Sequence, residues 1–257
     1  MDKLHHELWI VQATNALLAA LGLPAAPDHI VMCGVVTLIL ALTALLVRAR
    51  LSVENPGKFQ LVLEDIVGFL VGLLKQNIGE KGVRFLPLVG SIFLFIFTAN
   101  MIGKIPGLIS PTASLNTTVG CAVTVWIYYH IQGVRAQGIG PYLLHFAAPP
   151  GAPVWMAPIM LPIELISHLS RMLSLSLRLF GNIFGEEMVI LIIASIIPFI
   201  APLPMMLLGV VTGTLQAFIF ALLTMIYLAG AVHTAHDHDE AHAHGASHEG
   251  HAAHAHA

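Results

Sequence analysis

The sequence predicts an all-α integral membrane protein with about five membrane-spanning helices and one amphipathic helix that lies at the membrane interface. Of the 257 residues, 57% are hydrophobic and only 10% are charged, and the mean hydropathy is +0.84. Such a composition is typical of a chain that is mostly embedded in a lipid bilayer, and it argues strongly against a soluble globular protein. The net charge of −3 and the lack of a basic run give no support for nucleic acid as a partner.

The N-terminal part, residues 1–29, mixes charged and apolar residues and is predicted to be an extracytoplasmic segment. It does not have the pattern of a cleavable signal peptide, because a positive start is missing and Glu7 interrupts the apolar part. The first span follows at residues 30–47, which carry no charge. Arg48 and Arg50 come directly after it and indicate that this end of the helix is cytoplasmic.

Residues 54–80 are predicted to form an amphipathic helix. Apolar residues recur at helical spacing on one side of it, and charged or amide side chains occupy the other side. The apolar set is Phe59, Val62, Leu63, Ile66, Leu70, Leu73 and Leu74, and the polar set is Gln60, Glu64, Asp65, Lys75 and Gln76. A helix of this kind lies along the cytoplasmic membrane surface rather than crossing the bilayer.

Four further spans are predicted at residues 85–102, 115–132, 159–197 and 203–232. Proline residues in the linker between the spans 115–132 and 159–197 forbid a continuous helix there. The segment from Pro162 to Ile197 would be about 54 Å long as one helix, whereas the hydrocarbon core of a bilayer is about 30 Å thick. We therefore expect the last two spans to form a hairpin of unusually long, steeply tilted helices.

The distribution of positive charge predicts the topology. With the N-terminus outside, seven Lys and Arg residues lie on the cytoplasmic side and two lie outside, as the positive-inside rule requires. The C-terminus is then cytoplasmic. Residues 233–257, which hold nine of the 15 histidines, are predicted to be a disordered cytoplasmic tail with loose metal affinity. Their spacing defines no fixed metal site, and we expect no cofactor.

Charged residues cluster inside the fourth predicted span, where they are costly: an arginine at the centre of a membrane helix costs about 2.5 to 3.5 kcal/mol. At about 100° per residue, polar residues fall within about 80° of Arg178 on one side of the helix. They are Glu164, Ser167, His168, Arg171, Ser174, Asn182 and Glu186. Glu187 lies about 180° away, on the far side. A polar stripe of this kind faces protein or water rather than lipid, so the helix lines a pathway or meets a partner.

Two runs in the last two spans carry a resemblance. SLSLRLFGNIFGEE, residues 174–187, and LQAFIFALLTMIYLAGA, residues 215–231, closely resemble subunit a of the rotary F-type ATP synthase, and the resemblance covers most of residues 30–231. It implies a stator subunit whose tilted hairpin stands against a ring of rotor c subunits. The other implied partners are the peripheral-stalk b subunits, the rest of the F1Fo complex and the lipid bilayer. The implied location is the bacterial inner membrane.

The resemblance also assigns roles to residues. It implies that Arg178 is the essential arginine, Glu187 the channel acid and Gln216 the glutamine of the last helix. Asn182 and Ser174 match polar positions at the same interface.

Four other charged or polar residues are also assigned positions. Glu164, His168 and Arg171 are placed near the cytoplasmic entrance, although Glu164 and Arg171 would also fit a structural ion pair and His168 a packed polar residue. Many relatives carry a partner for the channel acid on the last helix, but this chain has Gly209 there. Glu186 is the candidate to take the place of that partner.

The implied function is proton translocation coupled to ring rotation. In such a stator, two offset half-channels deliver protons to the rotor carboxylates and remove them, and the arginine favours the ionised carboxylate as it passes. The chain has no GxxxxGK[ST] run, so ATP chemistry is expected in other subunits. The alternative is a self-contained ion or metal transporter whose histidine-rich tail buffers metal.

Overall fold

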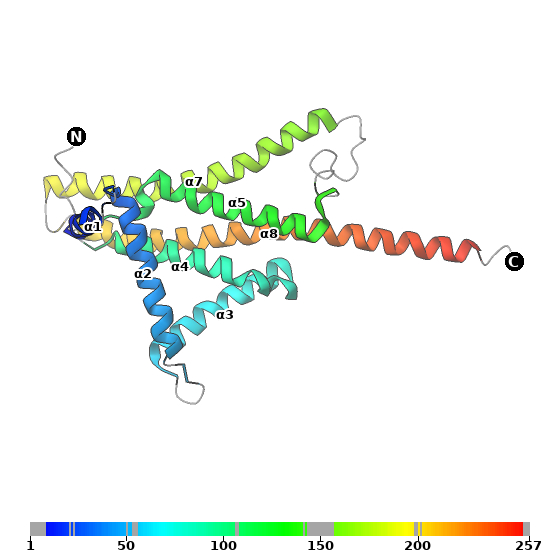
Figure 1. The fold of residues 1–257 in the computed structure, drawn as a ribbon, viewed down its shortest axis with the longest axis horizontal. Helices are drawn as coiled ribbons and strands as arrows, with labels where there is room; N and C mark the ends of the chain where they lie inside the picture. The colour runs from blue at the N-terminus through cyan, green and yellow to red at the C-terminus, as the bar shows by residue number, and fades with distance from the viewer. Residues whose placement is uncertain are drawn as a thin grey trace.

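The computed structural model describes residues 9–20, 22, 24–49, 51–52, 56–105, 108–140, 142, 157–197, 200 and 202–253. Every element in these residues is helical (Figure 1). The elements are α1 (Trp9–Ala20), α2 (Asp28–Ala49), α3 (Lys58–Ile78), η1 (Glu80–Phe85), α4 (Leu86–Ile102), η2 (Pro111–Ala113), α5 (Leu115–Gln137), α7 (Ala157–Ile196) and α8 (Pro202–Ala253). Outside the described residues lie 1–8 of the predicted N-terminal segment, 143–156 of the predicted linker and 254–257 of the predicted tail.

Four helical segments of the described chain are long and apolar enough to cross a membrane: Asp28–Ala49, Glu80–Ile102, Pro158–Ile196 and Pro202–Val232. They coincide with four of the five predicted spans, and the architecture is that of an all-α membrane protein. The other predicted span, in α5, does not meet the same criterion because Asn116, Thr118 and His130 are among its polar residues. Its crossing of the bilayer stays a prediction.

Helix α8 is the centre of the bundle. It contacts α3, α4, α5 and α7, and the main hydrophobic core forms where these five helices meet. Phe220, Met225 and Leu228 of α8 are fully buried there, together with Val125 of α5 and Leu179 of α7. Burying a side chain of this size contributes roughly 1.5–3 kcal/mol to stability when the unfolded state exposes it to water. Inside lipid this hydrophobic contribution is absent, and close packing between helices stabilises the core instead.

Helix α7 presents one face to this bundle and leaves the other open. Leu175, Leu179 and Ile183 are at most 2% exposed, whereas Leu173 and Leu177 are about half exposed. At 40 residues the helix is about 60 Å long. Because it is twice as long as the hydrocarbon core is thick, it fits a bilayer only if it is strongly tilted, as the sequence predicts.

Helix α2 leans away from the bundle, and α3 returns to it (Figure 1). An apolar cavity of about 1220 Å³ lies between α2, α3, α4 and α5.

The two halves of α3 differ in burial. Leu70 and Leu74 in its C-terminal half are at most 1% exposed, while Phe59 and Val62 in its N-terminal half are more than half exposed.

The two ends of the bundle are distinct. Figure 1 shows α1, the start of α2, the end of α7 and the start of α8 at one end, called here the hairpin end. The end of α5 and the start of α7 lie at the opposite end.

Beyond Val232, α8 continues as a helix to Ala253, where the sequence predicts a disordered tail. The run has no proline and is rich in alanine, the residue with the highest helix propensity.

Candidate functional site

Arg178 lies on the open face of α7. Its side chain is exposed, as are those of Ser174 and Leu177 beside it. Within the described part of the chain, Arg178 has no hydrogen-bonding or ion-pairing partner. The helix places it there because the buried face, centred on Leu179, is about 100° away around the axis.

One turn further along α7, Asn182 connects the open face to the interior. Its Nδ2 donates a hydrogen bond to Gln216 Oε1 of α8 at 2.7 Å. Gln216 is 2% exposed, and among the described residues its Nε2 has no acceptor. A buried amide donor left in this way costs about 1–3 kcal/mol, so the position of Gln216 is not explained by stability alone.

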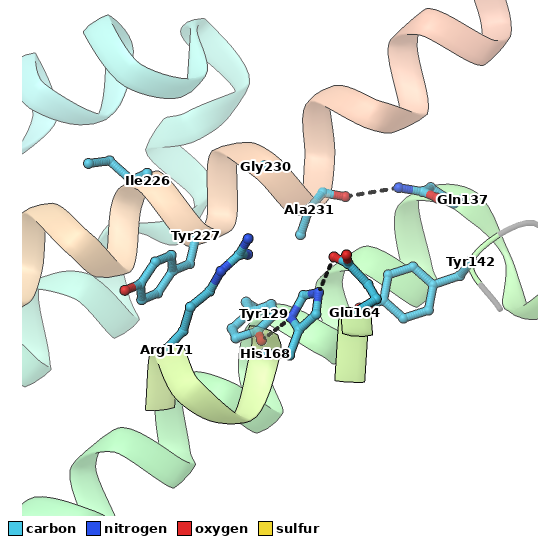
Figure 2. A pocket seen from close by; sticks show the side chains of 10 residues that line it. All are labelled: Tyr129, Gln137, Tyr142, Glu164, His168, Arg171, Ile226, Tyr227, Gly230 and Ala231. Carbon is cyan, nitrogen blue, oxygen red and sulfur yellow. Dashed lines mark hydrogen bonds and ion pairs between the residues drawn. The ribbon is translucent and has the colours of Figure 1, made fainter. Parts of the chain in front are cut away.

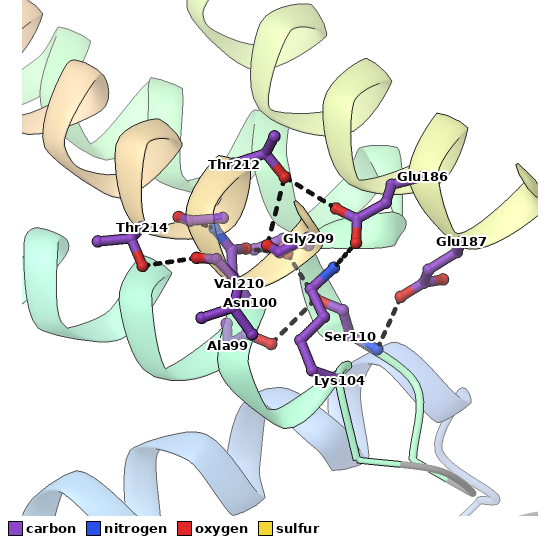
Figure 3. A network of polar contacts seen from close by, with 12 residues as sticks. Ala99, Asn100, Lys104, Ser110, Glu186, Glu187, Gly209, Val210, Thr212 and Thr214 are labelled. Carbon is purple, nitrogen blue, oxygen red and sulfur yellow. Dashed lines mark hydrogen bonds and ion pairs between the residues drawn. The ribbon is translucent and has the colours of Figure 1, made fainter. Parts of the chain in front are cut away.

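The two acids at the hairpin end have different surroundings, shown in Figure 3. Glu186 forms an ion pair with Lys104, which follows α4, and its Oε2 accepts a hydrogen bond from Thr212 Oγ1 of α8 at 3.2 Å. Glu187 Oε1 accepts a hydrogen bond from the backbone N–H of Ser110 at 3.2 Å. Glu187 also lines a cavity of about 440 Å³ together with Asp28 and His29 of α2.

A buried chain of hydrogen bonds continues behind Ser110. Ser110 Oγ donates to the carbonyl of Ala99 at 3.0 Å and lies 2.6 Å from Thr112 Oγ1. Thr112 Oγ1 donates to Asn100 Oδ1 at 2.7 Å, and Asn100 Nδ2 donates to the carbonyl of Gly213 in α8 at 2.9 Å. The chain therefore joins the segment after α4, η2 and α8 with no gap in its polar contacts.

A second polar site occupies the opposite end, around a cavity of about 390 Å³ between α5, α7 and α8 (Figure 2). His168 links two groups there: its Nδ1 lies 2.6 Å from Tyr129 Oη, and its Nε2 lies 3.2 Å from Glu164 Oε1. The guanidinium of Arg171 lies over the ring of Tyr227, 5.8 Å from its centroid.

Next to this cavity, Tyr142 Oη lies 2.5 Å from His130 Nδ1. Burial raises the pKa of Tyr142 to about 12, so its hydroxyl keeps its proton and can donate to the histidine. His130 in turn lies beside His168, with ring centroids 5.2 Å apart and the rings tilted by 42°.

Comparison with known proteins decides the family. A family model described as "ATP synthase A chain" matches residues 30–229. ATP synthase subunit a of Citrifermentans bemidjiense is 46% identical over 232 residues, which cover 90% of this chain and 99% of that protein. ATP synthase subunit a 3 of Pelobacter propionicus is 42% identical over 233 residues, with the same coverage. This chain belongs to the ATP synthase subunit a family.

Membership in the subunit a family supports a stator proton-channel role in the membrane sector of an F-type ATP synthase. It also supports a multi-pass location in the bacterial inner membrane, with the rest of the F1Fo complex as partner. Proton transport and ATP synthesis are consistent with the family and with the apolar helices.

In the structure, the predicted site residues of this chain lie in three groups. Glu164, His168 and Arg171 lie together at the opposite end, Glu186 and Glu187 lie at the hairpin end, and Arg178, Asn182, Gln216 and Ser174 lie between them. The polar residues that the sequence predicts on one side of α7 do not all have the same surroundings. Its centre, around Arg178, is exposed, whereas His168 and Glu186, about 80° around the axis, turn into the bundle.

Lys104, Ser110, Asn100 and Thr112 were not singled out from the sequence. Asn100 carried a usable signal, because it is an amide at the end of an otherwise apolar span. The others lie in a loop or a short helix, and their contacts with α7 and α8 depend on the tertiary fold.

Proposed function

We propose that this chain is the stator proton-channel subunit that couples proton flow to rotation of a ring of c subunits, with Arg178 facing the ring. The observation that carries the proposal is the position of Arg178: an exposed guanidinium, without a partner among the described residues, on a largely apolar helix face. In lipid such a group costs about 2.5 to 3.5 kcal/mol or more. A carboxylate on a partner protein offsets that cost, and the proposed rotor ring supplies one.

The mechanism follows from the charge of the arginine. A rotor carboxyl group is stable in lipid when it is protonated, and a guanidinium within a few ångströms favours its ionised form. The carboxyl group therefore releases its proton as it approaches Arg178 and takes up another after it has passed. Arginine side chains keep their charge in proteins, so Arg178 also blocks direct proton exchange between the two sides.

Two half-channels on opposite sides of Arg178 would deliver and remove the protons. Along α7, Glu164 lies about 21 Å from Arg178 on one side, and Glu187 about 13.5 Å on the other. Each borders a cavity. We assign Glu187 to the outer half-channel and Glu164, His168 and Arg171 to the cytoplasmic one, with Asn182, Gln216 and Ser174 at the rotor-facing boundary.

The remaining parts of the proposal concern assembly and orientation. The direct partners are the ring of c subunits and the peripheral-stalk b subunits. The N-terminus lies outside and the C-terminus in the cytoplasm, which places the hairpin end at the outer surface. In the described part of the chain, no group of three His, Cys, Asp or Glu side chains could hold a metal ion, so nothing there favours the alternative of a metal transporter.

ATP-driven proton uptake into inverted membrane vesicles tests the proposal. We expect Arg178→Ala to assemble into the complex and to abolish pumping, and Glu187→Gln to reduce it at least about tenfold, since a positioned proton-transfer group contributes roughly 10²–10⁴-fold. Arg135→Ala is the matched control, because Arg135 is an exposed arginine near the end of α5, on another helix than Arg178. Normal pumping by an assembled Arg178→Ala complex would contradict the proposal.

A further inference from the structure

The ion pair between Lys104 and Glu186 is unusually secluded. The side chains are 8% and 11% exposed, respectively. Thr212 adds a hydrogen bond to the other carboxylate oxygen. An exposed ion pair contributes little to stability, but removing one partner of a buried pair leaves an uncompensated charge and is strongly unfavourable. The pair is therefore a fixed feature of the hairpin end.

Gly209 of α8 makes room for this pair. A Cβ at residue 209 would overlap Glu186 Oε1 and lie 2.8 Å from Lys104 Nζ. The Glu186 carboxylate thus occupies the volume that a side chain on α8 would otherwise fill, as Figure 3 shows from the side of Lys104. Any residue larger than glycine at this position must displace the ion pair or separate α7 from α8.

The ion pair also holds the segment that contacts Glu187. Lys104 and Ser110 lie in the same connection between α4 and η2, and a Cβ at Gly103 would meet Ser110 Cβ at 2.5 Å, so the residue before Lys104 lies close against Ser110. Ser110 Oγ is bonded to the Ala99 carbonyl of α4. Anchoring Lys104 to α7 therefore fixes the backbone N–H of Ser110 that donates to Glu187.

Taken together, these contacts give the two adjacent acids different roles. Glu186 contacts the ammonium group of Lys104 and the hydroxyl of Thr212. Glu187 has one backbone N–H donor among the described residues and borders the cavity that also holds Asp28 and His29.

We propose that Lys104 and Glu186, seated on Gly209, are positioning residues. Through Ser110 they hold Glu187 at the outer cavity, so that Glu187 exchanges protons while Glu186 keeps Lys104 in place. The inference rests on the proposed proton-channel function, and it replaces a relay role for Glu186 with a positioning role.

The decisive experiment compares single and double variants of the pair in the whole complex, by ATP-driven proton uptake into inverted vesicles at equal complex content. Lys104→Gln and Glu186→Gln each leave one unpaired buried charge, and we expect each to lower pumping at least about tenfold. The double variant, Lys104→Gln with Glu186→Gln, keeps an amide hydrogen bond but no titratable group. We expect it to pump within about threefold of the native complex, because complete pairs can be replaced at little cost.

The conservative variant Lys104→Arg adds a readout that a purely structural contact would not give. Arginine retains the charge and should retain most of the pumping, whereas Lys104→Gln should not. If the single variants fail to assemble, Lys104→Arg and the double variant still decide the question. A double variant that assembles but pumps as poorly as Glu186→Gln would overturn the inference, because Glu186 would then carry protons itself.

Gly209→Ala tests separately whether a side chain at residue 209 would occupy the same volume as the Glu186 carboxylate. Its added methyl group would displace Glu186, so pumping should fall at least about tenfold, since overlap in a packed interior forces side chains and backbone to shift. Gly34→Ala in α2 is the matched control, because a Cβ there meets nothing within 4 Å. Native pumping by Gly209→Ala would contradict the assigned geometry.

Arg178→Ala and Glu187→Gln, measured in the same vesicles, separate this inference from the proposed function. If both reduce pumping while every pair variant pumps normally, the proton-channel function stands and the positioning role falls. If Arg178→Ala pumps normally, both fall.

Discussion

Adjacent residues on a helix point about 100° apart, and at the hairpin end that difference gives two neighbouring glutamates unlike surroundings. Glu186 turns toward α8 and Lys104, and Glu187 turns toward Ser110 and the start of α2. The two chemically identical groups therefore have different partners, and we propose different tasks for them.

The bridge between Asn182 and Gln216 makes a prediction about stability. Asn182→Ala removes the donor and leaves both polar atoms of buried Gln216 without partners, at a cost of about 1–3 kcal/mol. Gln216→Leu removes both of those atoms and should cost less, since an apolar group of similar size avoids the desolvation penalty. The measurement is the thermal unfolding midpoint of the purified complex. Equal losses for the two variants would show that the bridge does not satisfy Gln216.

A pair of neighbouring tyrosines offers a second test at this scale. Tyr129→Phe removes the hydroxyl beside His168 Nδ1 and should lower both the stability of α5–α7 packing, by about 0.5–1.5 kcal/mol, and the rate of coupled proton uptake. Tyr128→Phe is the control, because its ring packs against Phe85 and its hydroxyl makes no hydrogen bond within the described residues. A normal proton-uptake rate for Tyr129→Phe would show that the proposed cytoplasmic path does not need the Tyr129 hydroxyl.

Some site residues could be found from the sequence and others could not. Arg178 and Glu164 were conspicuous because charges inside an apolar helix need a reason, and helical spacing alone separated Glu187 from the polar stripe. Lys104 and Ser110 were not conspicuous, because a charged or hydroxyl side chain in a loop is ordinary. Their importance comes from contacts with residues 82 and 77 positions away in the chain, respectively, which no local pattern encodes.

Among the elements, α3 is the one whose two halves behave differently. Leu74→Ala creates a cavity at a fully buried site and should cost about 2–5 kcal/mol. Val62→Ala, at a site that is 55% exposed in this chain, should change stability by less than about 0.5 kcal/mol. The comparison is made by thermal unfolding of the detergent-solubilised complex. A large loss for Val62→Ala would mean that a partner protein covers the N-terminal half of α3.

The long helices were predicted well because their apolar runs are long and their ends carry charges, glycine or proline. The predicted span at 30–47 corresponds to α2 at Asp28–Ala49, and the span at 159–197 corresponds to α7 at Ala157–Ile196. Helix α1 was not predicted, because the short apolar run at Trp9–Ala20 follows a mixed segment. Helix α8 continues to Ala253, through residues for which the histidine-rich composition predicts a disordered tail.

For the whole molecule, orientation in the membrane is the property that fusion proteins can test. A green fluorescent protein fused after Ala257 should fluoresce, because the positive charges predict a cytoplasmic C-terminus and this reporter folds on that side. A periplasmic phosphatase fused at the same residue is the control and should stay inactive. The reverse pattern would place the hairpin end in the cytoplasm and exchange the two proposed half-channels.

The surface of the whole molecule explains why it is expected to function inside a larger assembly. Large apolar side chains are exposed along α2, α7 and the first half of α8, including Leu42, Leu191 and Leu207. Lipid can cover such surfaces, but it cannot satisfy Arg178. Under the proposed function, the molecule therefore combines a self-contained packed core with one face that is completed when the rotor ring supplies a charge.

Because the carboxylate of residue 186 occupies the volume above residue 209, these two positions cannot vary independently. A chain with glutamate at 186 and an uncharged or acidic residue at 104 would be disfavoured, as would one with large side chains at both 186 and 209. Across related sequences the two sites should therefore alternate, with bulk on α7 accompanied by glycine on α8 and bulk on α8 accompanied by a small residue on α7. The packing contact between residues 186 and 209 therefore limits which pairs of mutations at these two positions can be accepted together during evolution.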